Sequence, residues 1–246
     1  MVSRQREFVF LLLGLAGVLL LSSCSLPWQH SSASASSVGP KPTAQQLITA
    51  LQKNFRSVKS FHVVMSTQNL SSTTASQVQI RGASGDIIMP DKIKAQAMVL
   101  LSGQAVTVNL ISIGDTQYIT DPITGQWRTI KGVLDPRTLT NPDTGILSLV
   151  GKLQNLTGPT DDVVGGVPCW RITGALNAKY IAFFTGGGVP AGTMLQTSGC
   201  IGKADGLPYQ LSVTGQAAPG DTPQSVRSFN VSNYNENISI TAPQVP

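Results

Sequence analysis

The chain has 246 residues, of which only 12% are charged, and its formal net charge is +5. The basic residues are spread along the chain without clusters, which excludes a basic nucleic-acid-binding surface. Beyond residue 23, 15 basic and 11 acidic side chains remain, so the charge falls only to about +4. This composition is typical of an exported domain.

The first 24 residues have the pattern of a lipoprotein signal peptide. Arg4 and Arg6 precede an apolar run over residues 8–21, and two serines then lead to Cys24. The run is long enough to enter the translocon but short for a permanent membrane span. We expect residues 1–23 to be removed and the Cys24 thiol to carry a lipid, which anchors the protein to the outer face of the cytoplasmic membrane. The alternative is a transmembrane anchor with an incidental cysteine.

We expect residues 24–42 to form a flexible tether between this lipid and the folded domain. They are rich in serine and alanine, end in the sequence GPKP and show no apolar periodicity. A single folded domain is then expected over residues 43–246.

Two amphipathic helices are predicted in this domain. In the first, Thr43 is the N-cap and the apolar residues recur near the helical period at Leu47, Ile48, Leu51, Phe55 and Val58. The second would begin after Asp143 or Thr144 and end at Gly158 and Pro159. Its apolar face would consist of Ile146, Leu147, Val150, Leu153 and Leu156.

The rest of the domain has the alternating pattern of ten or eleven β-strands. The segments are residues 61–68, 77–89, 93–101, 106–110, 117–120, 127–130, 167–173, 193–201, 207–215, 225–231 and 237–241. Short turns between them imply antiparallel pairing. A sheet of this width twists and curls, and its apolar face must be covered.

Two short helices are too small to cover so wide a sheet, which predicts an apolar cavity on the concave side. The expected lining is Leu147 and Val150 from the second helix and Val99, Val106 and Val108 from the sheet. Alternatively, loops and large side chains fill this space.

Cys169 and Cys200 lie in two predicted strands, at positions that alternate with the core-facing residues. If these strands are antiparallel neighbours, a facing pair would lie within disulfide reach, and an exported protein can be oxidised. Two independent buried thiols are the alternative.

The sequence predicts no enzyme, no cofactor and no metal site. His62 is the only histidine of the folded region, and its place between Phe61 and Val63 at a strand start favours a structural role. His30 lies in the tether, which argues against a metal site. A Gly-x-Ser-x-Gly elbow is absent, and Gly186–Gly188 lack the strand-to-helix context of a phosphate loop.

Several short motifs follow one another between residues 43 and 243. They are VKSFH (58–62), GDIIMPD (85–91), IGDTQYI (113–119), DDVVGGV (161–167), RITG (171–174), GKADGLP (202–208) and ISITAP (238–243). In this order and spacing they resemble the LppX/LprG family of mycobacterial lipoproteins, whose domain is similar to the LolA/LolB lipoprotein carriers. Residues 129–144 and the pair of Cys169 and Cys200 depart from the family pattern.

The resemblance implies a curved antiparallel half-barrel with helices on its concave side and a pocket for the acyl chains of a lipid or glycolipid. It implies a membrane-anchored lipoprotein that carries or presents this ligand at the outer face of the membrane. The expected partners are the lipid or glycolipid and, through Cys24, the membrane; the sequence points to no particular transporter. A cell-surface structural or signalling module of the same fold, without a lipid ligand, is the alternative.

Overall fold

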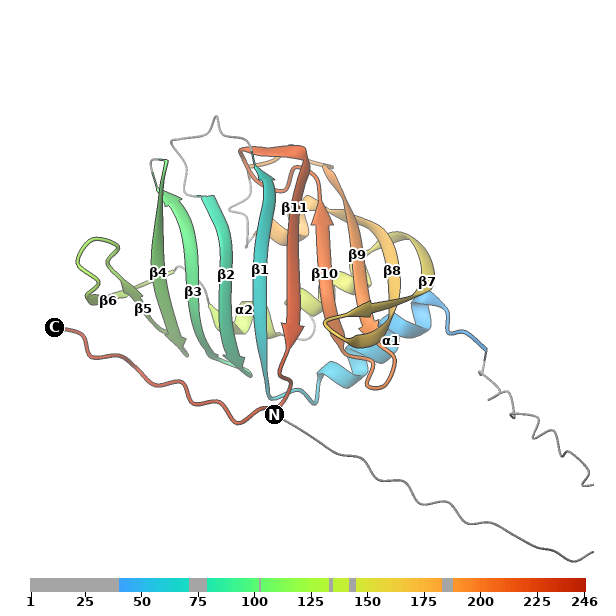
Figure 1. Ribbon diagram of the computed structural model, residues 1–246, viewed down its shortest axis with the longest axis horizontal. Helices are drawn as coiled ribbons and strands as arrows, with labels where there is room; N and C mark the ends of the chain where they lie inside the picture. Colours follow the sequence, from blue (N-terminus) through green and yellow to red (C-terminus); the bar gives the residue numbers. More distant parts are fainter. Residues whose placement is uncertain (1–39, 71–78, 102, 133–134, 142–144, 183–187) are drawn as a thin grey trace, which may run out of the picture. The chain divides into compact units, whose positions relative to one another are not determined.

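The computed structural model describes residues 40–70, 79–101, 103–132, 135–141, 145–182 and 188–246. In this part of the chain, eleven strands form one antiparallel sheet (Figure 1). The strands are β1 (Ser60–Leu70), β2 (Gln79–Ile88), β3 (Lys92–Leu101), β4 (Gln104–Ile113), β5 (Thr116–Thr120), β6 (Trp127–Ile130), β7 (Gln154–Val164), β8 (Val167–Asn177), β9 (Met194–Gly202), β10 (Pro208–Thr214) and β11 (Asp221–Ser232).

The sheet consists of two meanders that meet in its middle. Its order is β6-β5-β4-β3-β2-β1-β11-β10-β9-β8-β7, so every pair except β1 with β11 joins strands that follow each other in sequence. The β1–β11 ladder places Val63 opposite Val231 and Met65 opposite Phe229. The first and last strands therefore hold the two halves of the sheet together.

Four short helical segments accompany the sheet, namely α1 (Ala44–Phe55), α2 (Pro136–Thr140) and the 3-10 helices η1 (Ile146–Lys152) and η2 (Ala178–Ile181), among the described residues. Helix α1 begins where predicted, because Thr43 and Gln46 form a capping box. It lies against β7 and η1 at one end of the sheet (Figure 1). The predicted fold class, a curved antiparallel half-barrel sheet with helices on its concave side, is confirmed.

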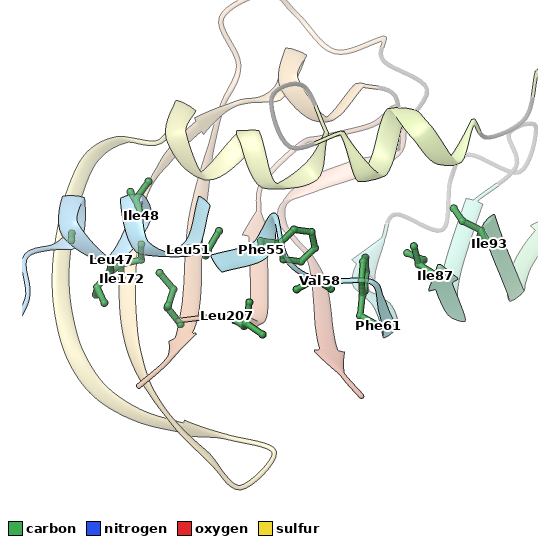
Figure 2. Close-up of a cluster of buried hydrophobic side chains, with 12 residues drawn as sticks. Leu47, Ile48, Leu51, Phe55, Val58, Phe61, Ile87, Ile93, Ile172 and Leu207 are labelled. Atoms are coloured by element: carbon green, nitrogen blue, oxygen red, sulfur yellow. The ribbon is translucent and has the colours of Figure 1, made fainter. Parts of the chain in front are cut away.

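The apolar face of α1 forms the main core. Leu51 and Phe55 are 1% and 4% exposed, and they belong to one cluster with Phe61 of β1 and Ile172 of β8 (Figure 2). The rings of Phe55 and Phe61 meet edge to face, with centroids 5.6 Å apart. We call the sheet face on which α1 packs the inner face and the opposite one the outer face. A second core, around Leu195 and Val213, lies on the same face.

The predicted second helix is confirmed only as the seven-residue 3-10 helix η1 (Ile146–Lys152), and the prediction is wrong beyond Lys152. Only η1 is helical there, and Leu156 lies in β7, a strand that the sequence pattern did not predict. The three-residue spacing of Leu153 and Leu156 fits a helix, but the backbone of this segment pairs with β8 instead, for example Thr157 with Thr173. The predicted caps, residues 143–144, lie outside the described residues.

The predicted strand over residues 237–241 is also wrong, since this segment has no ladder partner in the described structure. Asn233 and Asn235 adopt the left-handed conformation, with φ of 54° and 61°, and turn the chain away from the sheet. The Asn235 backbone N–H then donates to the Ser60 carbonyl at 2.8 Å, and the Tyr234 hydroxyl donates to the Pro208 carbonyl. These two bonds fix Tyr234 and Asn235 next to the starts of β10 and β1.

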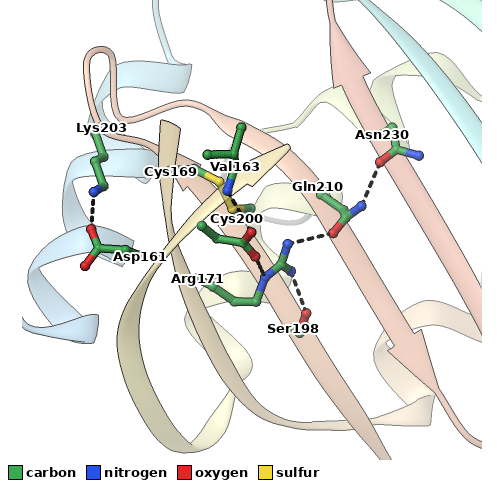
Figure 3. The surroundings of a disulfide bond; sticks show 10 residues. Asp161, Val163, Cys169, Arg171, Ser198, Cys200, Lys203, Gln210 and Asn230 are labelled. Atoms are coloured by element: carbon green, nitrogen blue, oxygen red, sulfur yellow. Dashed lines mark hydrogen bonds and ion pairs between the residues drawn. A yellow bond between two sulfur atoms is a disulfide. The ribbon is translucent and has the colours of Figure 1, made fainter. Parts of the chain in front are cut away.

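Cys169 and Cys200 form a disulfide bond between β8 and β9 (Figure 3). Both residues are fully buried, and they lie on the outer face, because they alternate with Ile172 and Ile201 of the inner core. The strands are antiparallel neighbours, but Cys169 stands opposite Gly202 and Cys200 opposite Arg171. The bond therefore joins diagonal positions, with Cα atoms 5.6 Å apart, and not a directly facing pair.

This bond closes a loop with a sequence separation of 31 residues. In the chain-entropy model, its reduction should lower the free energy of unfolding by about 3–4 kcal/mol. Urea unfolding with and without a reductant measures the effect. The double variant Cys169→Ala/Cys200→Ala is the control, because its midpoint should not respond to the reductant. Equal midpoints for the oxidised and reduced wild-type protein would contradict the prediction.

Candidate functional site

An apolar pocket lies on the inner face, between the helical segments and the middle of the sheet. It comprises about 860 Å³ of space free of protein atoms, including its open mouth. The lining residues are Leu51, Phe55, Phe61, Val63, Ile87, Val150, Leu153, Ile172, Gly199, Cys200, Ile201, Pro208, Gln210, Leu211, Phe229 and Val231. Of these, Gln210 alone has a polar side chain.

The amide group of Gln210 takes part in hydrogen bonds on the outer face. Its Oε1 accepts from Arg171 at 2.9 Å, and its Nε2 donates to Asn230 Oδ1 at 2.9 Å (Figure 3). Arg171 is part of a polar ladder that also contains Asp162 and Ser198. The pocket thus has an uncharged, apolar interior.

Strand pairing builds the floor of this pocket. Phe229 stands opposite Leu211, Leu211 opposite Gly199, and Gly199 opposite Ile172, so these residues form one row across four strands of the inner face. Gly199 leaves a gap in the row. A Cβ atom added there would meet only the carbonyl oxygen of Gln210, at an ordinary contact distance of 3.7 Å.

The predicted lining residues are divided between the pocket and its surroundings. Val150 lines the pocket. Leu147 belongs to η1, but its side chain lies outside the described part of the structure. The row of Val108 runs through Ala97 and Ala83 to Met65, which lies on the same face of β1 as Val63. Val106 and Val99 face each other two residues further along β4 and β3, so all three valines share the inner face, yet none of them lines the pocket.

Sequence reasoning missed the contribution of α1, of β1 and β2, and of β8–β11. The apolar face of α1 was evident, and Leu51 and Phe55 could have been proposed from it. Phe229 and Leu211 could not, because their place beside β1 depends on the pairing of the first strand with the last.

Several charged groups lie on the outer face and at the β7 edge. The Arg171 guanidinium donates to the Asp162 carboxylate and lowers its pKa. The ammonium groups of Lys203 and Lys41 lie 4.0 Å and 5.1 Å from the centroid of the Trp170 ring. Lys203 also donates to Asp161 and lowers the pKa of that carboxyl.

His62 lies on the outer face between Ser84 and Asp86. Its Nδ1 is 2.6 Å from Asp86 Oδ1, and its Nε2 is 3.2 Å from Ser84 Oγ. These three side chain types can form a nucleophilic triad, but Ser84 lies in a strand paired on both sides, so the backbone N–H groups around it serve the sheet and not an oxyanion hole. None of the three residues lines the pocket. We assign them a structural role.

The described residues contain neither a metal-binding cluster nor a membrane-spanning helix. No cluster of three or more histidine, cysteine, aspartate or glutamate residues there could hold a metal ion. Among the same residues, no helix has the length and apolar character needed to cross a membrane. Cys24 and the preceding apolar run lie outside the described residues.

Comparison with known proteins identifies the family of this fold. Residues 43–240 match the model of the LppX_LprAFG lipoprotein family. The chain belongs to this family. The lipoarabinomannan carrier protein LprG of Mycobacterium tuberculosis is 23% identical over 224 residues, which cover 87% of this chain and 88% of that protein. The resemblance inferred from the motifs is thus confirmed.

Two solved structures of the LppX_LprAFG type share the fold. LprF from Mycobacterium bovis superposes with a TM-score of 0.65 at 20% identity, covering 83% of this chain and 98% of that chain. LppX from Mycobacterium tuberculosis gives a TM-score of 0.58 at 17% identity, covering 82% of this chain and 100% of that chain.

The gap at Gly199 provides a test of the pocket. Gly199→Leu should place a side chain in the free space without a backbone clash, and it should weaken the binding of an apolar fluorescent dye by about tenfold or more. Dye titration and thermal unfolding measure the two quantities. Ser84→Leu adds similar bulk to the outer face and should leave dye binding unchanged. If Gly199→Leu binds dye like the wild type, or abolishes cooperative unfolding, the space is not an open pocket.

Proposed function

We propose that this protein is a membrane-anchored lipoprotein that binds the acyl chains of a lipid or glycolipid in its apolar pocket and carries or presents the ligand at the outer face of the membrane. The observation that carries the proposal is the pocket itself, which has only one polar side chain in its described lining, Gln210, with its amide engaged on the outer face. Each buried methylene contributes about 0.8 kcal/mol, so about six enclosed methylenes contribute about 5 kcal/mol without a charged anchor.

Family membership supports the same class of ligand. The relative LprG is a lipoarabinomannan carrier protein. This chain shares its family, and its own pocket has the apolar lining that acyl chains require. The anchor in this proposal is the lipid on Cys24, which follows the predicted signal peptide of residues 1–23 and precedes the predicted tether of residues 24–42.

Native mass spectrometry and lipid extraction of the purified full chain test the proposal. The chain should carry Cys24→Ala, so that any lipid found is held without a covalent bond. We expect a bound species that is released by organic solvent and contains acyl chains. Gly199→Leu, purified in parallel, should carry less of it. A wild-type pocket that neither carries nor takes up lipid would favour the structural module with the same fold.

The anchor has a separate test. Cys24→Ala should abolish acylation while export continues, because the thiol of this residue is the expected lipid acceptor. Incorporation of labelled fatty acid and partitioning into detergent measure the lipid. A variant that still incorporates the label and partitions like the wild-type protein would show that the anchor lies elsewhere.

A further inference from the structure

A buried hydroxyl group lies one step beyond the floor of the pocket. Thr197 precedes Gly199 by two residues on β9. Side chains two residues apart on a strand point to the same face, at about 7 Å from each other. Its neighbours across the sheet are Val213 on β10 and Gly174 on β8. Thr197 therefore faces the same interior as the lining residue Gly199.

The contacts of Gly174 connect this position to the pocket on a second side. A Cβ atom at Gly174 would lie 3.4 Å from the side chain of Leu153, so Leu153 covers this glycine closely. Leu153 is itself a lining residue of the pocket, as is Leu211, which precedes Val213 by two residues on β10. Thr197 thus lies between the pocket, on the side of Gly199, and the second core, on the side of Leu195 and Val213.

The hydroxyl of Thr197 has no hydrogen-bond partner among the described residues, although the residue is only 3% exposed. Buried polar groups in folded proteins are nearly always paired, and the exceptions call for a partner such as a ligand. Thr67 on β1 has the same property at 8% exposure. It lies in the same row but three strand spacings away, about 14 Å, beside Met65, which is not a lining residue.

The charge in this row is already paired. The Arg227 side chain, 13% exposed, donates through both terminal nitrogens to Asp221, whose side chain is 1% exposed. Asp221 Oδ2 also accepts the backbone N–H groups of Ala217 and Ala218. A ligand carboxylate or phosphate in this row would have to displace Asp221 from Arg227 or lie close to the buried Asp221 carboxylate. Both cost free energy, so the row favours an uncharged hydrogen-bond acceptor over an anion.

We propose that the Thr197 hydroxyl donates a hydrogen bond to an uncharged oxygen at the head of an acyl chain, such as the carbonyl of an ester. The chain lies in the pocket, and the ester lies one step further along β9. This inference rests on the proposed function, because it needs an acyl chain in the pocket. It adds that the site selects acyl esters over free fatty acids and hydrocarbons.

Three probes of equal chain length test the inference: hexadecane, methyl palmitate and sodium palmitate. They compete with an apolar dye for the full chain carrying Cys24→Ala. In the parent protein, methyl palmitate should bind more tightly than the other two. Thr197→Val should weaken methyl palmitate by about tenfold and leave hexadecane unchanged, because one donor is lost and the apolar lining is kept.

Thr67→Val is the matched control, since it also replaces a buried unpaired hydroxyl but lies away from the lining. It should leave the preference for the ester intact. Both valine variants should melt at the same temperature as the parent or higher without ligand. Thr197→Ser should keep the preference for methyl palmitate, because it keeps the hydroxyl, and Thr197→Ala should lose it. This second pair of variants tests the role of the hydroxyl if Thr197→Val does not fold.

The outcomes separate the two proposals. If no probe binds the parent protein, the proposed function fails. If hexadecane and methyl palmitate both bind but Thr197→Val leaves their affinity ratio unchanged, the pocket binds acyl chains and the role of Thr197 is refuted. Tighter binding of palmitate than of methyl palmitate would also refute the role of Thr197, because the site would then favour an anionic headgroup over an uncharged ester.

Discussion

The pairing of β1 with β11 is the constraint on which the rest of the structure depends. It joins the two meanders of the sheet, and it places Phe61 and Val63 from the start of the domain beside Phe229 and Val231 from its end. All four residues line the pocket. The cavity therefore exists only after the chain has closed on itself, and each half of the sheet alone would carry an exposed apolar face without a site.

The dimensions of the elements explain why that face stays partly open. Helix α1 has 12 residues and is about 18 Å long, whereas eleven strands span about 48 Å. The helix covers the β7 end, and the short segment η1 adds Val150 to the lining. The space between the helical cover and the middle of the sheet is the pocket, so the cavity follows from the small helical content of the sequence.

Local features of the structure were predictable and distant ones were not. Alternation placed Cys169 and Cys200 on the face opposite Ile172 and Ile201, but only the register shows that they are diagonal. Val99, Val106 and Val108 have the inner-face orientation expected from their alternation, yet the site lies across the β1–β11 junction, which no local pattern reveals. From Gln154 onward, pairing with β8 outweighs the helical spacing of Leu153 and Leu156.

The outer face of the sheet contributes polar cross-strand contacts that are separate from the apolar pocket. On the outer face, side-chain hydrogen bonds run from Asp162 through Arg171 to Ser198 and Gln210, and from Gln210 to Asn230, so they connect β7, β8, β9, β10 and β11. The disulfide lies on this face as well. These bonds hold the strands together without using any inner-face group, which leaves the lining free to be apolar. In the proposed function, a ligand would enter or leave the inner face while the hydrogen bonds of the outer face keep the floor of the pocket in place.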